Sequence, residues 1–328
     1  MRLHRTVVAG GMVVCLLGAA APGSGQDVSL RYRWTKGGES RTRMTQQVIT
    51  TSSTPGGLGN ASTDFTMSQV FRTVVEDVAA DGTATLRQTI ESIRVEFNTP
   101  AGKTVFDSTS TDGAAATDLL TRAMSAGYSA TIGQAITIVA SPTGTVQKIE
   151  GMARLLERVL NAQPQDRVAP DLLEGLRNTF SDDTTRDMLG WGIAPFPDRP
   201  LHAGDTWEDR LRATVPMLGA TTTSRTWTLQ EVASTDGVPV ARLAAKLSIR
   251  ADAAVPQAAF GPVAMQTGEG TGGSELLFDM ARGRLQRTTT VLTQPMTMSF
   301  PVPNGDKMSM QMLVNSTLTL ELIDAGGR

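Results

Sequence analysis

The stretch MSMQMLVNSTLTLEL, Met308–Leu322, decides the fold. Every second residue is apolar except Ser316, so one side of the segment is apolar and the other polar, as in a half-buried β-strand. The alternation continues for about 15 residues, whereas strands usually have five or six. Because strands twist, a strand of this length must coil. The segment therefore predicts a strongly curved sheet.

A second methionine-rich strand, QPMTMSF (Gln294–Phe300), precedes this segment and forms a hairpin with it. The two strands project methionines to the same side: Met296, Met298, Met308, Met310 and Met312. Methionine is flexible and polarisable, so such a surface adapts to irregular acyl chains or to varied apolar partners. Two interpretations stay open: the methionines fill the core against helices, or they form a lipid- or partner-binding surface.

One strand–turn–strand pattern occurs twice, as VVEDVAADGTATLRQTIESI (Val74–Ile93) and as LQEVASTDGVPVARLAAKLSI (Leu229–Ile249). Both copies have Asp-Gly at the turn, a pair that supports tight hairpins because glycine accepts a positive φ. In the first copy the apolar phase slips by one residue near Glu91–Ser92, which predicts a β-bulge there.

A second pair of hairpins follows in the same order, with ITIVASPTGTVQKI turning at Gly144 and LLFDMARGRLQRTT turning at Gly283. The shared order predicts two tandem copies of one antiparallel unit. The alternative is that glycine turns between alternating strands recur in any β-rich protein.

Helical patterns lie in the first copy and between the copies. Helices are expected over Gly113–Ala126, Gly151–Leu160 and Ala169–Phe180, from apolar residues at helical spacing. A further helix is expected after Ser181, which is a suitable N-cap, with aspartates favoured in its first turn.

The N-terminus has the pattern of a secretory signal peptide. Arg2 and Arg5 precede an apolar run and the small-residue stretch PGSGQ, which favours cleavage after Gly25. We therefore expect a signal peptide over 1–25, a first β unit over 26–150, a helical insert over 151–194 and a second β unit over 195–328. The mature chain would be periplasmic or extracellular and without a transmembrane segment. Cys15, the single cysteine, would leave with the signal.

Composition excludes several function classes. The formal net charge is −2, from 30 basic and 32 acidic residues that are scattered along the chain. This distribution does not suggest a nucleic-acid partner or an anionic membrane surface.

No motif predicts catalysis, a cofactor or a metal. His202 has Asp205, Glu208 and Asp209 nearby, but a turn leading into a strand explains this spacing at least as well. Asp182, Asp183 and Asp187 could bind calcium, yet they also fit a helix start. The chain has four tryptophans and two tyrosines, few for a sugar-binding cleft.

The chain resembles a family of exported bacterial proteins of unknown function. The similar segments are LRYRWTKGG (Leu30–Gly38), TIGQAITIVASPTGTVQKIEG (Thr131–Gly151), RPLHAGDTWE (Arg199–Glu208) and GSELLFDMARGRLQRTTT (Gly273–Thr290). Many members of that family look like lipoproteins, whereas Cys15 follows two valines instead of small residues, so a lipid anchor is not implied here. The expected curved sheet is also distantly similar to the half-barrel of bacterial lipoprotein carriers.

Together these features predict an α+β fold, mostly antiparallel, with two tandem half-barrel-like units and packed helices. The expected function is non-enzymatic binding of a hydrophobic ligand or lipid in a groove between sheet and helices. The alternative is an envelope structural or protein-interaction module that binds an envelope protein and no ligand. A hydrolase is the third interpretation.

Overall fold

The computed structural model describes residues 27–53, 60–100, 102–110, 119–162, 181–189, 193–215, 219–235, 237–251, 264–301 and 307–324. The expected signal peptide and the expected helix Ala169–Phe180 lie outside these residues.

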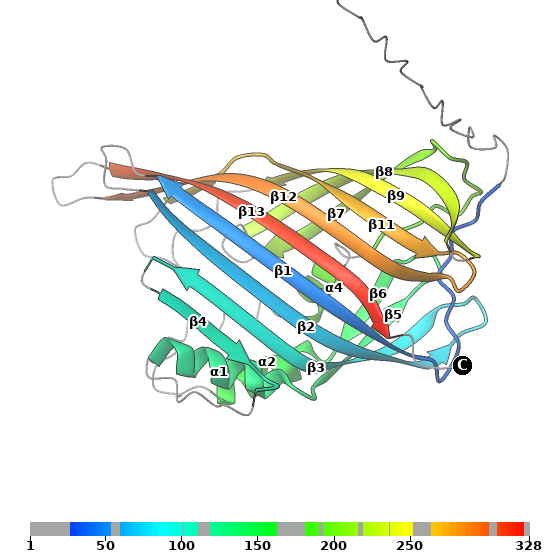
Figure 1. The fold of residues 1–328 in the computed structure, drawn as a ribbon, viewed down its shortest axis with the longest axis horizontal. Helices are drawn as coiled ribbons and strands as arrows, with labels where there is room; N and C mark the ends of the chain where they lie inside the picture. The colour runs from blue at the N-terminus through cyan, green and yellow to red at the C-terminus, as the bar shows by residue number, and fades with distance from the viewer. Residues whose placement is uncertain are drawn as a thin grey trace, which may run out of the picture.

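Within the described residues the strands form one sheet, and all of its pairings are antiparallel (Figure 1). The strands are β1 (Glu39–Ser53), β2 (Asn60–Val78), β3 (Ala84–Thr99), β4 (Gly102–Asp107), β5 (Ala135–Ala140), β6 (Val146–Glu150), β7 (Thr206–Val215), β8 (Gly219–Thr235), β9 (Val238–Ala251), β10 (Ala264–Thr267), β11 (Gly270–Asp279), β12 (Arg284–Pro301) and β13 (Lys307–Asp324). Their order is β6-β5-β3-β2-β1-β13-β12-β11-β9-β8-β7, with β4 paired to β3 and β10 paired to β12.

The prediction of an α+β fold with two tandem half-barrel-like units and packed helices is wrong. Most of the described residues lie in strands and few lie in helices, and the sheet is a single open one of 13 strands. The reason lies in β13, which pairs with β12 on one side and with β1 on the other along most of its length. Both long edges of this strand are therefore used, so the two halves share one continuous hydrogen-bonded sheet.

The predicted hairpins and the predicted bulge are confirmed. Gly82, Gly144 and Gly283 sit at the hairpin turns with φ of 84°, 86° and 61°. In the β2–β3 ladder Val70 faces Ser92 and the next residue of β2 faces Ile90, so Glu91 is the extra residue. The apolar phase slip near Glu91 thus has its physical cause in a bulge.

The strand order repeats within the sheet. Strands before the helical region follow β6-β5-β3-β2-β1, and those after it follow β12-β11-β9-β8-β7, with β13 between the two sets. The hairpins that look alike in sequence, β2–β3 with β8–β9 and β5–β6 with β11–β12, occupy equivalent places in these two orders. The domain boundaries at 150 and 195 remain predictions.

The described helices are α1 (Leu119–Thr131), α2 (Met152–Asn161) and α4 (Asp182–Leu189). Ser181 caps α4 as predicted, because its hydroxyl accepts a hydrogen bond from the Thr184 amide at 3.2 Å. The α4 helix contacts β6 and β7, the first and last strands of the order. A flat sheet would separate these strands by about 48 Å, whereas α4 is only about 12 Å long. The sheet must therefore curl strongly, as Figure 1 shows.

One row of paired residues crosses the sheet from β4 to β7 and defines its inner face. The row is Phe106, Val95, Met67, Gln46, Leu318, Thr290, Ser274, Ala245, Trp227 and Trp207. Directly opposed residues of neighbouring strands share a face. Phe106 stacks on Tyr128 of α1, with 5.8 Å between ring centroids, so α1 lies on this face.

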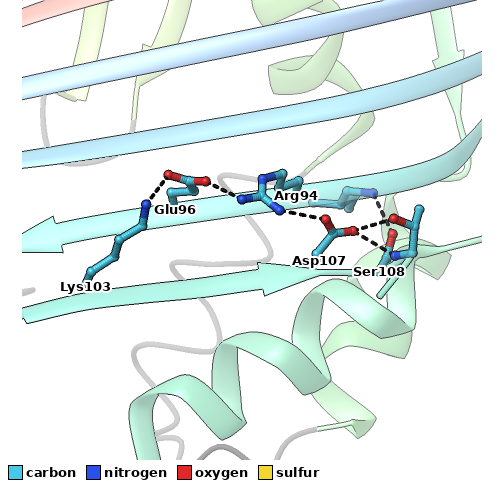
Figure 2. Close-up of polar contacts among 7 residues, drawn as sticks. Arg94, Glu96, Lys103, Asp107 and Ser108 are labelled. Carbon is cyan, nitrogen blue, oxygen red and sulfur yellow. Dashed lines mark hydrogen bonds and ion pairs between the residues drawn. The ribbon is translucent and has the colours of Figure 1, made fainter. Parts of the chain in front are cut away.

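The opposite, outer face carries paired charges. Figure 2 shows Lys103, Glu96, Arg94 and Asp107 in a line along β3 and β4. The separations are 2.8 Å for Lys103–Glu96, 2.5 Å for Arg94–Glu96 and 2.8 Å for Arg94–Asp107. Hydrogen bonds from Lys103 and Arg94 lower the pKa of the Glu96 carboxyl. Exposed pairs of this kind stabilise little, but they keep this part of the outer face polar.

Candidate functional site

The inner face is closed at one end by residues 27–34, here called the N-terminal strap. The Tyr32 amide donates to the Pro142 carbonyl in the β5–β6 turn, and the Arg33 amide donates to the Gly283 carbonyl in the β11–β12 turn, both at 2.8 Å. The strap thereby ties together two turns from the two halves of the sheet. In Figure 1 it is the blue segment before β1, at the right-hand end of the molecule.

Behind the strap lies the main hydrophobic cluster. Leu30 of the strap and Phe196 pack with buried residues of β8, β9 and β11, among them Trp227, Leu243 and Phe278. Their exposed fractions are between 0% and 4%, so water is excluded from this end of the inner face.

A buried ion pair belongs to this closed end. Arg225 of β8 is 2% exposed and binds Asp209 of β7, with 3.0 Å between Nε and Oδ1. The Trp227 indole donates to the same carboxylate at 2.9 Å, and the Arg225 guanidinium lies 5.4 Å from the centre of the Trp227 ring. Hydrogen bonds on this carboxylate compensate part of the cost of burying the two charges. We interpret this group as part of the closed core.

Tyr32 is the polar residue of the strap's aromatic stack. Its ring stacks on Phe196, with centroids 5.2 Å apart, and its hydroxyl is buried with no hydrogen-bond partner among the described residues. Burial raises the pKa of the Tyr32 phenol well above its ordinary value, although the positive charge of Arg225 opposes the shift. The phenol therefore stays neutral in the folded protein.

The four long strands β2, β1, β13 and β12 form the middle of the sheet, here called the seam. Their inner-face residues include many large apolar side chains that are only half-buried: Met44, Val48, Phe65, Met67, Leu292, Val314, Leu318, Leu320 and Leu322. The main cluster at the strap contains none of these residues. The seam thus has a partly exposed apolar surface on the inner, concave face of the sheet.

The five predicted methionines lie at the end of the seam that is far from the strap. Met296 of β12 is directly opposite Met312 of β13, and Met298 is opposite Met310. Met308 is opposite Phe300, so the register brings all five methionines to one face, which is the inner face. Met296 is 7% exposed and the other four are half-buried. A ligand-facing role for them stays a prediction.

A cavity of about 720 Å³ lies at this end. Three neighbouring rows across the strands line it. The middle row is Ala61, Ser52, Met312, Met296 and Thr267, and the rows on either side of it, such as Ser62, Thr51, Leu313 and Pro295, belong by register to the outer face. Ligand pockets typically have volumes of roughly 300–1,000 Å³. The cavity is therefore large enough for part of a lipid-sized molecule.

Sequence reasoning did not find Ala61, Ser52, Thr267 or the nearby Gln294. Ala61 and Ser52 come from the β1–β2 hairpin, near the beginning of the chain, and reach Met312 only through the β1–β13 register. A small residue on an alternating strand carries no local signal of a cavity, so only the pairing of distant strands could reveal it.

Among the described side chains, which do not include that of Asp187, no three His, Cys, Asp or Glu residues converge. His202 is half exposed and its Nε2 lies 2.8 Å from Asp27, while Arg199 and the His202 amide both bind Asp205. These contacts form a turn before β7. In α4, Asp182 accepts a hydrogen bond from the Met152 amide, and Asp183 pairs with Arg186.

Among the helices described, none is long and apolar enough to cross a membrane.

The chain belongs to a family of unknown function, DUF6263, whose members match it over residues 81–283. This confirms the expectation of a family without an assigned activity. Proteins of curated function show no match to the chain.

Several solved structures are weakly similar. A structure on lipid–protein interactions in lipovitellin is 11% identical, with a TM-score of 0.42, and the match covers 90% of this chain but only 26% of that one. DynF from the dynemicin biosynthesis pathway of Micromonospora chersina is 8% identical, covering 91% of this chain and 86% of that one, with a TM-score of 0.18. A DUF1329 family protein from Desulfovibrio piger is 9% identical, with coverages of 87% and 86% and a TM-score of 0.12. These similarities are too low to assign a fold or a ligand to this chain.

Proposed function

We propose that this protein acts outside the cytoplasm and binds a hydrophobic ligand, a lipid, on the inner face of the seam without transforming it chemically. The observation that carries the proposal is the half-buried apolar inner face of β2, β1, β13 and β12, which leads into the cavity at Met296 and Met312. Large contiguous apolar surfaces on a protein usually mark a binding site.

The shape of the sheet supports a small ligand over a flat protein partner. The inner face is concave, because both edge strands contact α4, and the strap closes one end of it. A concave apolar surface surrounds a flexible chain on several sides, and methionines can adjust to its irregular outline. The location outside the cytoplasm rests on the N-terminal sequence pattern.

Native mass spectrometry of protein purified from its own envelope tests both parts of the proposal. We expect a chain that begins at Gln26 and carries a lipid that organic extraction removes. The extracted protein should then bind N-phenyl-1-naphthylamine, an uncharged apolar fluorophore, and release it when lipid is added.

A charge in the cavity should weaken this binding. Met312→Glu places a carboxylate on the inner face, and we expect at least about a tenfold loss of affinity, since an unpaired charge in an apolar site is costly. The matched control is Val291→Glu on β12, because Val291 is 48% exposed and lies on the outer face, opposite Thr317. Equal binding by both variants would place the ligand elsewhere. Protein that carries no lipid, binds no fluorophore and crosslinks to an envelope protein would instead support the interaction module.

A further inference from the structure

The two ends of the seam differ in charge. Near the strap its strands carry charged residues, among them Arg43, Arg287 and Glu321. At the methionines its strands and the adjoining β10 carry no Asp, Glu, Lys, Arg or His, although 19% of the chain is charged. This part of the protein, here called the neutral end, consists of residues 49–53, 60–63, 264–267, 294–301 and 308–315.

The β12–β13 hairpin projects from the neutral end. Pairing of β1 with β13 stops at Ser53, opposite Gln311, whereas β12 and β13 stay paired as far as Pro301 and Lys307. Figure 1 shows the end of this hairpin at the left of the molecule, beyond the arrowhead of β1. We call residues 298–301 and 307–310 the hairpin tip.

One side of the hairpin tip is apolar. Met298 is directly opposite Met310, and Phe300 is directly opposite Met308, so all four side chains lie on the inner face. Each of them is partly exposed. The hairpin tip therefore presents large apolar side chains at the extreme end of the sheet.

The other side of the hairpin tip and of the strands behind it is polar but uncharged. Thr297 is opposite Gln311 on the outer face, and the Ser299 and Ser309 hydroxyls share a hydrogen bond of 2.9 Å. Hydroxyl and carboxamide groups can donate to the ester and phosphate oxygens of lipid headgroups without bringing a charge into the bilayer surface, where charges are costly. Lys307 is the charged residue of the described tip, and its long side chain can extend to water.

A second copy of the chain, or another protein, fits the neutral end less well than a lipid surface. A fully exposed side chain of this size has roughly 200 Å² of surface, so the four partly buried apolar side chains together expose at most about 300 Å². A stable protein interface buries about 800 Å² on each partner. Trp, Tyr and Arg, which dominate the binding energy of such interfaces, do not occur in the neutral end. A fluid bilayer requires neither a large matching area nor these residues.

We infer, on the basis of the proposed function, that the neutral end docks on the surface of a lipid bilayer. The apolar side of the hairpin tip enters the acyl region, and the polar side contacts the headgroups, as in other amphipathic elements that lie at a membrane surface. A lipid then passes between the bilayer and the inner face of the seam without crossing water. Because the docking surface is uncharged, docking does not depend on anionic lipid.

Co-flotation with vesicles tests the inference on the unaltered protein. The vesicles contain dioleoylphosphatidylcholine alone or with about 30% dioleoylphosphatidylglycerol, at about 0.05 M and 0.5 M NaCl, because electrostatic attraction is screened at the higher salt. We expect the bound fraction to agree within about twofold under all four conditions. Absence of binding, binding to the anionic vesicles alone, or binding that is lost at high salt would overturn the inference.

A charge on the hairpin tip should prevent docking. Met310→Glu should lower the affinity for phosphatidylcholine vesicles at least about tenfold, because a carboxylate enters the acyl region only at high cost. The matched control is Ile323→Glu, since Ile323 is 38% exposed and lies at the opposite end of the same strand. Equal losses in the two variants would contradict docking through the neutral end.

A fluorescent label locates the contact even if Met310→Glu does not fold. Bimane is attached to Gln311→Cys in the neutral end, or to Thr235→Cys beside the β8–β9 turn, each in a Cys15→Ser background that makes the label unique. Both positions are exposed. Brominated phosphatidylcholine should quench the label at position 311 and not the label at position 235, and the reverse pattern would overturn the inference.

The proposed function and this inference fail in different ways. Protein that binds N-phenyl-1-naphthylamine in solution but no vesicles would overturn the inference alone. A vesicle-independent dimer that Met310→Glu dissociates would also overturn it, in favour of a second copy. Protein that carries no lipid and binds no fluorophore would overturn the proposed function.

Discussion

The inner faces of β9 and β13 carry the same alternating pattern but have different surroundings. Leu243, Leu247 and Ile249 of β9 are at most 7% exposed, whereas Leu318 and Leu320 of β13 remain half-buried. The strap and the segment around Phe196 pack into the cluster that contains the first two β9 residues. Alternation in the sequence therefore shows which residues share a face of a strand. Whether that face is buried depends on which other segments of the chain pack against it.

Truncating one large side chain at each end measures this difference directly. Trp227→Ala should cost about 3–5 kcal/mol of unfolding free energy, because it opens a cavity in a dry cluster. Met310→Ala, in the half-buried methionine group, should cost about 1 kcal/mol or less. Urea denaturation of the lipid-free protein gives both values, and similar losses would mean that the two ends are equally well packed.

The contacts of the strap can be broken at a turn. Gly144 has a φ of 86°, and a Cβ there would lie 2.6 Å from the Tyr32 ring and 2.7 Å from the Ala194 carbonyl oxygen. Gly144→Ala should therefore cost about 2–4 kcal/mol, from left-handed backbone strain plus overpacking.

Gly204→Ala measures the cost of left-handed backbone strain without overpacking. Gly204 has a φ of 93° but open space around it, so only the strain of about 1–2 kcal/mol remains. If thermal unfolding shows the same loss for both glycines, the strap does not press on the β5–β6 turn.

The last expected effect concerns the pH dependence of stability and the chain's two tyrosines. Burial raises the pKa of Tyr32, so its phenol stays protonated in the folded protein while the unfolded chain ionises above about pH 10. The stability that the Tyr32 phenol contributes is therefore fully present below pH 10. Above pH 10 the free energy of unfolding falls by about 1.4 kcal/mol per pH unit because of this group.

Tyr32→Phe should remove this part of the alkaline loss, as read from the difference between the two proteins in urea unfolding at pH 9, 10 and 11. Tyr128→Phe is the control in the helix region. Tyr128 is less buried, and although burial raises its pKa too, a smaller change is expected. A Tyr32→Phe protein with an unaltered alkaline slope would show that the strap opens before the phenol ionises.

Several local features could be predicted from sequence because their causes are local. Glycines at 82, 144 and 283 take the positive φ that the hairpin turns require. The phase slip at Glu91 marks a bulge, since one extra residue reverses the face of all that follow. Ser181 caps α4 through a hydrogen bond to a residue three positions away.

The candidate site was only partly predictable, because only some of its features have local causes. The five methionines lie on two strands joined by a short connection, so their common side follows from alternation within a hairpin. Gln294 has no such signal, because Gly268 and Gly270 come beside it only through the β10–β12 and β11–β12 pairings. The expectation of two tandem half-barrel-like units failed because no local pattern states which strand will pair with a free strand edge.

Sequence alone determined the antiparallel strands, their turns, the polarity of each strand face and the side that the methionines share. These properties depend on the backbone preferences and side-chain periodicity of neighbouring residues. Tertiary structure decided that β13 joins the two halves, that the strap covers one end of the inner face, and that the methionine end keeps a cavity. Those outcomes depend on hydrogen bonds and packing between residues from opposite ends of the chain, and the free energy of such contacts is defined only once the whole sheet has formed.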